Sequence, residues 1–451
     1  MQDTLRMPLK WIVVGVAAFF VAVAVIFWLG TRDCELSAEV ARSVRKPDLS
    51  LPKDEENIYV GMLAAQKVYC DESCLECDED EEEDELTPEQ EKARMDAFLA
   101  TNAAAIAILH EAAKRPFWRD KDFVAFCERE LAAAVAGSGA DDEELRTIDL
   151  LRLLNEDGRR RLERGEIASA MEDMRSLLSI GMKMQDGVEC SLNWLLAGES
   201  CRLALQLARE SARSKGLADG ELETIRELIR PICDSDRLRR SVMSAADAEH
   251  WLRDRLFGRP GSLSDSMPHG PLGWILQSFA FHPNRVRNLL ANDMREAREL
   301  LSRDYDKAAW AAFDAKANAV LHKGRLAILR PNYVGEVLVG LSVKGVCPLA
   351  RSRAQLEFGA SATSIVLALE MCRRKTGRRV EKLADLVPQF LPSVPVDPYD
   401  TAAEIKYDAK SGILWSVGED RIFTGKEPPD PDDFRARDSV IKIDDEWRYL
   451  L

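Results

Sequence analysis

The chain has 451 residues and a formal net charge of −15. This length exceeds what one hydrophobic core supports, so we expect about two or three domains. Residues 71–85 contain eleven acidic residues and no basic one, and removing those eleven charges from −15 leaves −4. Because the remainder has no basic stripe, the sequence does not predict nucleic-acid binding. Its ten cysteines are too sparse for a disulfide scaffold.

Near the N-terminus, twenty residues without a charge run from Trp11 to Gly30, between Lys10 and Arg32. A helix of this length spans roughly 30 Å, the thickness of the hydrocarbon core of a bilayer. The segment lacks both the polar face of a core helix and the small-residue cleavage site of a signal peptide. We therefore predict a short N-terminal tail at 1–10 and a transmembrane helix at 11–30 that anchors the chain in the lipid bilayer.

The orientation of this anchor is not set by the charges beside it, because basic residues flank it on both sides. A region of about 420 residues follows, and domains of that size are translocated largely regardless of their charge. We therefore expect a single-pass protein with the bulk of the chain outside the cytoplasm.

A polar stalk at 31–54 follows the anchor, and an acidic loop occupies 71–86. We interpret the acidic run as a solvated, self-repelling loop; a cation-binding or partner-docking segment is the alternative. Cys70, Cys74 and Cys77 beside it lack a nearby fourth ligand for zinc. We therefore interpret these cysteines as ordinary thiols.

Apolar periodicity predicts a succession of amphipathic helices, the first near 56–69. Thr87, Pro88 and Gln90 mark the start of a helix that we expect to continue to about Lys114. Further helices are predicted near 120–136 and 141–163. The clearest apolar stripe, which follows one helical face, consists of Ile167, Ala170, Met171, Met174, Leu177, Leu178, Gly181 and Met182.

Two more stripes continue the pattern: Leu192, Leu196, Leu203 and Leu207, then Leu222, Ile225 and Ile229. Short connections between such helices favour antiparallel neighbours. We therefore predict a mainly α fold, in which an irregular array of antiparallel amphipathic helices follows the transmembrane helix. The predicted parts are a helical domain at 55–257, a Pro/Gly-rich loop or boundary at 258–284, a second helical group at 285–349 with helices near 284–303 and 305–322, and a long helix at about 350–376 within a C-terminal module at 350–451.

The C-terminal module is predicted to be a small α+β unit. Residues 404–407 and 413–417 form a β-hairpin, and 440–443 add a third strand. Alternation along the hairpin predicts that one face covers the helix at 350–376, through Ile405, Tyr407, Ile413 and Trp415.

The segment LVPQFLPSVPVDPYD, followed by a hairpin that ends LWSVGED, resembles the C-terminal region of the major pseudopilins of type II secretion. In that family a DPW turn precedes a strand, and a serine-leucine-glycine stretch opens a calcium-binding loop. The matching positions are Asp397, Pro398 and Tyr399, then Ser416, Val417, Gly418 and Asp420. The N-terminal processing motif of pseudopilins is absent, since Pro8-Leu9-Lys10-Trp11 stands in its place.

By that resemblance, Asp420 with Asp432 or Asp438 is the candidate calcium site. Calcium takes six to eight oxygen ligands, of which neighbouring carboxylates supply several. Arg421 stands where the family tends to have glycine and brings a positive charge to the loop. An acidic surface loop that binds no ion is the alternative.

A looser resemblance extends over residues 55–443. It combines Glu56-Asn57 with Tyr59, FLATNAAAIAILHEAAKRPF at 98–117, RGEIASAMEDMRSLLSIG at 164–181 and the terminal hairpin. This layout is similar to a group of uncharacterised single-pass bacterial envelope proteins. The resemblance implies a fold and a location, the bacterial cytoplasmic (inner) membrane, and it implies no chemistry.

No phosphate-binding glycine loop, nucleophile elbow or paired zinc motif occurs in the sequence. His110-Glu111 is the first half of a zincin motif, but Lys114 replaces the second histidine, so we interpret the match as chance. His269 and His282 lie in or beside the Pro/Gly-rich segment without a paired acid or nucleophile. We assign no catalytic or cofactor-binding residue.

These observations favour a membrane-anchored, non-catalytic scaffold or protein-binding protein of the bacterial cell envelope. Its expected partners are the bilayer, through residues 11–30, and a protein on the helical domain. One alternative is an accessory component of a secretion or pilus-like apparatus, which follows from the pseudopilin resemblance. The other is an envelope enzyme, since a fold alone does not exclude chemistry.

Overall fold

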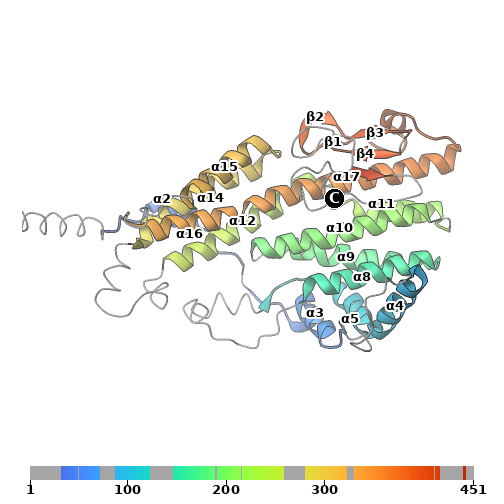
Figure 1. The fold of residues 1–451 in the computed structure, drawn as a ribbon, viewed down its shortest axis with the longest axis horizontal. Coiled ribbons are helices and arrows are strands. Elements are labelled where there is room, and N and C mark those ends of the chain that lie inside the picture. Colours follow the sequence, from blue (N-terminus) through green and yellow to red (C-terminus); the bar gives the residue numbers. More distant parts are fainter. Residues whose placement is uncertain are drawn as a thin grey trace, which may run out of the picture.

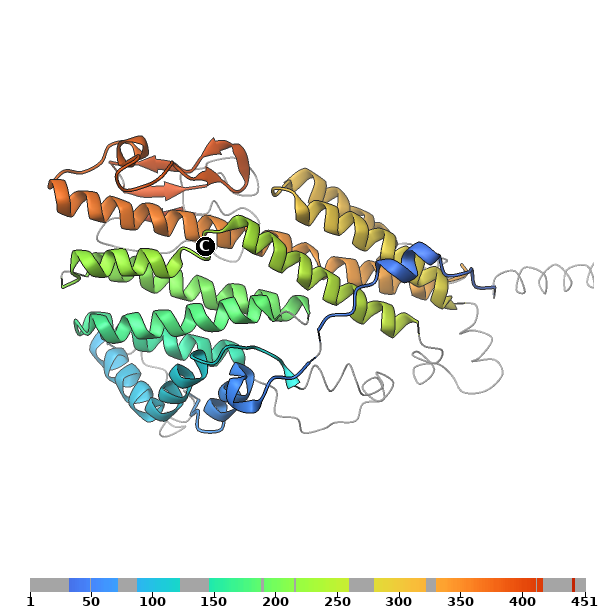
Figure 2. The same cartoon turned by 180° about the vertical axis from the view of Figure 1, so that it is seen from behind.

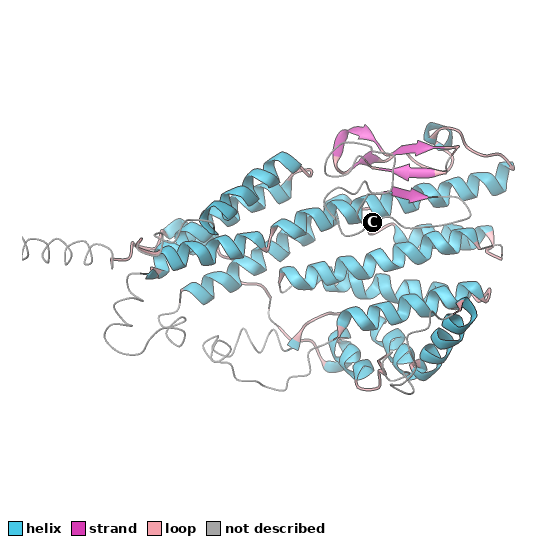
Figure 3. Ribbon diagram, in the orientation of Figure 1, coloured by secondary structure: helices cyan, strands magenta, loops and turns pink. Residues whose placement is uncertain are grey.

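The fold is mainly α-helical, as the sequence predicts, with a few short strands (Figures 1 and 3). The computed structural model describes residues 32–48, 50–71, 87–121, 146–187, 190–214, 216–258, 280–321, 330–410, 412–416 and the strand at 440–442. The predicted transmembrane helix, most of the acidic loop and the calcium candidates Asp420, Asp432 and Asp438 lie outside these residues.

The helices and strands are named in chain order. The α-helices are α2 (Ala38–Ser43), α3 (Ile58–Gln66), α4 (Pro88–Thr101), α5 (Ala103–Ala113), α8 (Thr147–Glu163), α9 (Ile167–Asp186), α10 (Ser191–Arg213), α11 (Asp219–Ile229), α12 (Ser235–Phe257), α14 (Pro283–Ser302), α15 (Lys307–Leu321), α16 (Tyr333–Lys344) and α17 (Cys347–Thr376). The strands are β1 (Val396–Asp397), β2 (Asp400–Glu404), β3 (Lys406–Asp408), β4 (Ile413–Trp415) and β5 (Val440–Lys442).

The helices are stacked in layers on either side of α17 (Figure 1). On one side α17 packs against α10, α10 packs against α9, and α9 packs against α8 and α5. The strands lie on the opposite side of α17, as an antiparallel pair β1–β2 and an antiparallel sheet in the order β3–β4–β5. Toward the N-terminal end of α17, helices α12, α14, α15 and α16 form a second group.

Two clusters of buried apolar side chains form the core, and α17 contributes to both. The first cluster joins α3–α5, α8–α11 and the strands to the α17 residues from Leu356 to Cys372. The second joins α12 and α14–α16 to Leu349, Ala350 and Ala354 of α17. The thirty residues of α17 therefore connect the two helical groups.

Among the described residues, the stretch Tyr333–Thr376 is long and apolar enough to cross a membrane, with a mean hydropathy of 1.4 in its most apolar window. A core helix satisfies the same criteria of length and composition. Phe358 and Leu367 are buried in the first cluster and Val343 is buried in the second. We therefore treat α16 and α17 as core helices.

The apolar stripe of α9 is confirmed. Met174, Leu177 and Leu178 are buried in the first cluster. The stripe of α10 is confirmed at Leu203 and Leu207 but is wrong at Leu192, whose side chain is 60% exposed. Leu192 is the second residue of α10, whose main packing partners are α9 and α17.

The helix predicted from Thr87 to Lys114 is two helices in the structure. Its start is confirmed, because Thr87 and Gln90 form a reciprocal capping box. It breaks at Asn102, whose buried side chain accepts a hydrogen bond from the Cys70 backbone N–H (2.8 Å) and donates one to the Cys70 carbonyl (3.0 Å). This tie to a residue 32 positions earlier separates α4 from α5.

The hairpin and its third strand are confirmed. The predicted inward face is confirmed at Ile405 and Tyr407 but is wrong at Ile413 and Trp415. The register pairs Tyr407 with Leu414 and Lys406 with Trp415. Leu414 and Ile405 are therefore the buried hairpin residues, in the same cluster as Leu356 and Leu367 of α17. Ile413 and Trp415 point to the other face of the strand and are only partly buried.

We predict that Leu178→Ala lowers the free energy of unfolding by about 2–5 kcal/mol, because it removes buried methyl groups and leaves a cavity. Leu192→Ala makes the same chemical change at an exposed position and is expected to cost less than about 0.5 kcal/mol. Denaturant titration of both variants measures the difference. Equal losses at the two positions would contradict the packing of α9.

Candidate functional site

Three helices bring five polar side chains together inside the first helical group. His110 lies on α5, Asp157 and Arg161 lie on α8, and Asp173 and Ser176 lie on α9. Helices α8 and α9 are joined by a tight turn at Gly165, which has a φ of 76°. The two aspartates lie eight residues before and eight residues after this glycine. The antiparallel pairing of α8 and α9 therefore places them opposite each other.

The five side chains form a continuous chain of contacts, which we call the His110 cluster. His110 Nε2 lies 3.0 Å from Asp173 Oδ1, and His110 Nδ1 lies 2.8 Å from Ser176 Oγ. The Arg161 guanidinium lies 3.2 Å from Asp173 Oδ2 and 2.8 Å from Asp157 Oδ2. The Asp173 side chain is fully buried, and those of His110 and Asp157 are at most one-tenth exposed.

Burial dominates the electrostatics of the cluster. It raises the pKa of Asp157 to about 6, with a further increase from the charge of Asp173 and a partial offset by Arg161. Burial also raises the pKa of Asp173, whereas its hydrogen bond from His110 and the charge of Arg161 oppose that increase. The Arg161 guanidinium beside both carboxylates favours their ionised forms in the interior.

The cluster has the donor set of a metal site. One ligand atom each from His110, Asp157 and Asp173 lie within 4.8 Å of one another, and zinc accepts imidazole and carboxylate ligands. The Arg161 guanidinium, however, contacts oxygens of both aspartates, so a cation bound there would meet a fixed positive charge. The arrangement supports a buried ion-pair network that links α5, α8 and α9 more directly than it supports metal binding or catalysis.

The sequence interpretation did not find this cluster. It treated His110 as a chance half-motif and did not consider Asp157 or Asp173. One signal was available, because Asp173 directly precedes Met174 and borders the apolar stripe of an amphipathic helix. A carboxylate at such a position needs a partner.

The other histidines do not converge with this cluster. His282 is buried at the N-cap of α14, and His250 is buried on α12. His269 and His322 lie outside the described residues.

At the C-terminal module, the structure brings together three of the positions that match the pseudopilin region. Asp397 is buried, and its Oδ1 accepts hydrogen bonds from the Tyr399 backbone N–H (2.9 Å) and from Ser416 Oγ (2.7 Å). The Tyr399 ring packs edge-on against Tyr305, with ring centroids 5.4 Å apart. Residues 417–439 are outside the described part of the chain, so the calcium site stays a prediction.

No protein-family model, curated protein or solved structure matches the chain.

We predict that Asp157→Asn flattens the pH dependence of stability between about pH 4 and pH 6. The pKa of Asp157 is about 6 in the folded protein, against 3.8 for an unperturbed aspartate, so the folded state binds this proton more tightly. Ionisation of Asp157 therefore destabilises the fold as the pH rises through this window, by at most about 3 kcal/mol at neutral pH. The variant should lose less stability than the wild type over the same range.

Asp96→Asn is the matched control, because Arg160 lowers the pKa of Asp96. Its carboxylate stabilises the fold above its unfolded pKa, and this contribution is lost as the pH falls. The control should therefore change the pH profile in the opposite direction. Urea titrations at a series of pH values test both, and an unchanged Asp157→Asn profile would contradict the elevated pKa.

Proposed function

We propose that the chain is a membrane-anchored, non-catalytic scaffold or protein-binding protein of the bacterial cell envelope. Residues 11–30 cross the inner membrane in this proposal, and the bulk of the chain lies on the extracytoplasmic side. The main support for this proposal is that residues 33–40, which follow the predicted anchor, contact α14 of the helical body.

The start of the stalk is docked along α14. Asp33 accepts hydrogen bonds from the backbone N–H groups of Asn284 (2.8 Å) and Arg285 (3.0 Å), in the first turn of that helix. Asn288, one turn further on, accepts a hydrogen bond from the Ser37 N–H (3.1 Å) and donates one to the Glu35 carbonyl (3.1 Å). These contacts follow one face of α14.

The docking continues into α2. Glu39 lies 3.1 Å from Arg295, and Val40 is buried although most of its neighbours are exposed. Figure 2 shows the following segment continuing along the outside of the molecule to α3.

The Asp33 contact has a clear physical basis. The first N–H groups of a helix lack partners within the helix and carry a partial positive charge, so a carboxylate stabilises them. His282, at the N-cap of α14, makes no capping hydrogen bond with its side chain. Asp33 therefore supplies this cap from a distant part of the chain. An anchor that ends at Gly30 would hold the helical body close to the bilayer rather than on a loose tether.

The layers of helices beyond this attachment support a binding role. Stacked amphipathic helices present broad faces to protein partners. The His110 cluster is buried and occupied by its own ion pairs, so it supports packing rather than turnover.

A second candidate, an accessory component of a secretion or pilus-like apparatus, is favoured by the Asp397–Ser416 contact. This contact joins two of the positions that match the pseudopilin module. Calcium binding that Asp420→Ala abolishes would make this the leading candidate.

The test of membrane attachment is carbonate extraction of membranes that contain the full-length protein. We expect the protein to stay in the pellet, because a continuous apolar helix is held by the hydrocarbon core. A variant that lacks residues 1–31 is the control and should be released into the supernatant. Release of the full-length protein would contradict the proposal. Proximity labelling of the anchored protein then identifies its partner.

A further inference from the structure

A surface pocket of about 310 Å³ lies between α12, α14 and residues 33–45. We call residues 33–45, which include α2, the docked segment. Four of its lining residues are arginines, two from the docked segment and two from α14. The charged and titratable residues in its wall are Arg42, Arg45, Asp247, His250, Arg295 and Arg298. The pocket exists because the docked segment covers the groove between the two longer helices.

The charges of the pocket do not cancel. Arg298 forms an ion pair with Asp247, and Arg295 forms one with Glu39 outside the wall. Arg42 donates from Nε to the Ala38 carbonyl of its own helix (2.9 Å). Within the described residues, no carboxylate forms an ion pair with Arg42 or Arg45. The pocket therefore keeps two uncompensated guanidinium groups.

A buried histidine completes the wall. His250 is 7% exposed, and its Nε2 has no hydrogen-bond partner in the described structure. Nε2 itself is closed off from the pocket, so a ligand there would be held by the arginines rather than by this nitrogen.

We propose that this pocket binds the phosphate group of an anionic organic ligand. Guanidinium groups donate paired hydrogen bonds whose spacing matches phosphate oxygens. The volume lies at the small end of the range for ligand sites, which suits a phosphate with a small attached group such as glycerol. Two sources have this chemistry: the headgroup of a membrane lipid and a soluble phosphate ester.

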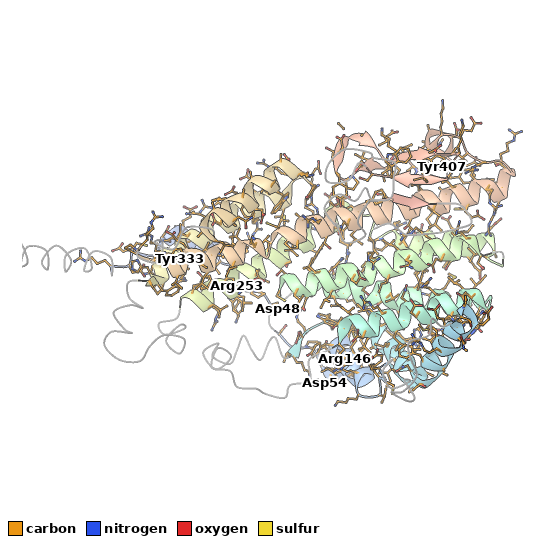
Figure 4. The ribbon with its side chains drawn as sticks, in the orientation of Figure 1. Asp48, Asp54, Arg146, Arg253, Tyr333 and Tyr407 are labelled. Carbon is orange, nitrogen blue, oxygen red and sulfur yellow. The ribbon has the colours of Figure 1, made fainter. Side chains whose placement is uncertain are left out.

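The lipid source depends on the proposed membrane anchor. Arg42 is twelve residues beyond Gly30, so even a fully extended chain leaves it within about 43 Å of the end of the predicted span. The intervening α2 shortens this reach. Figure 4 shows Arg253 and Tyr333 toward the same end of the molecule as α2, whereas Tyr407 is at the opposite end.

The test is calorimetric titration of the full-length protein in an uncharged detergent. The probes are glycerol 3-phosphate for the soluble source and a short-chain phosphatidylglycerol for the lipid source, with short-chain phosphatidylcholine as the zwitterionic control. We expect saturable binding of at least one phosphate probe. The double variant Arg42→Gln/Arg45→Gln should weaken that binding by about tenfold or more, because two charge-assisted contacts are lost.

The matched control is Arg378→Gln/Arg379→Gln, which removes two adjacent exposed arginines beyond the far end of α17. It changes the net charge by the same amount and should leave the affinity unchanged. Binding of glycerol 3-phosphate supports the soluble source, and binding of phosphatidylglycerol alone supports the lipid source. Equal losses in the two double variants, or no binding of either phosphate probe, would overturn the proposal. Carbonate extraction tests the membrane anchor, and these titrations test the phosphate pocket. One result does not decide the other, so failure of either proposal can be recognised separately.

Discussion

The buried guanidinium of Arg353 ties α14 to α17, the helix that connects the two helical groups of this protein. Arg353 lies on α17, is 1% exposed, and donates hydrogen bonds to the carbonyls of Leu301 (2.5 Å) and Arg303 (2.7 Å) at the end of α14. These carbonyls lack partners within their own helix and carry its partial negative charge, so a cation there is doubly favourable. The contact ties the C-terminal end of α14 to the N-terminal quarter of α17, the helix that both hydrophobic clusters share. Helix α14 also packs against α12 and α16, and it carries the docked segment and lines the arginine pocket.

Helix α14 is consequently stabilised at both ends by distant residues. Asp33 caps its first turn and Arg353 binds its last carbonyls. This arrangement explains why residues 33–43 lie on the helical body rather than forming a free stalk.

Local patterns in the sequence predicted the helices and the hairpin. Contacts between distant residues determine the helix break, the buried face of the hairpin and the polar clusters, and local patterns do not contain them. The α9 stripe could be predicted because eight residues repeat on one helical face. The break at Asn102 was not, because it depends on Cys70. Leu414 replaced Ile413 and Trp415 as the buried hairpin residue because strand register is set by pairing and not by composition. The His110 cluster takes residues from three helices, so no single window of sequence contains it, and the arginine pocket combines residues more than 200 positions apart.

The central claim is that the docked segment holds the α14 end of the molecule at the bilayer. The most direct measurement places a fluorescent side chain at exposed Arg285 or at exposed Arg378 in the full-length protein, in bilayers with quencher-labelled lipid headgroups. Helix α17 alone, at about 1.5 Å per residue, spans about 45 Å between the two ends. The account predicts strong quenching at position 285, weak quenching at 378, and a smaller difference when Asp33→Ala removes the α14 cap. Equal quenching at the two positions in the wild type would contradict it.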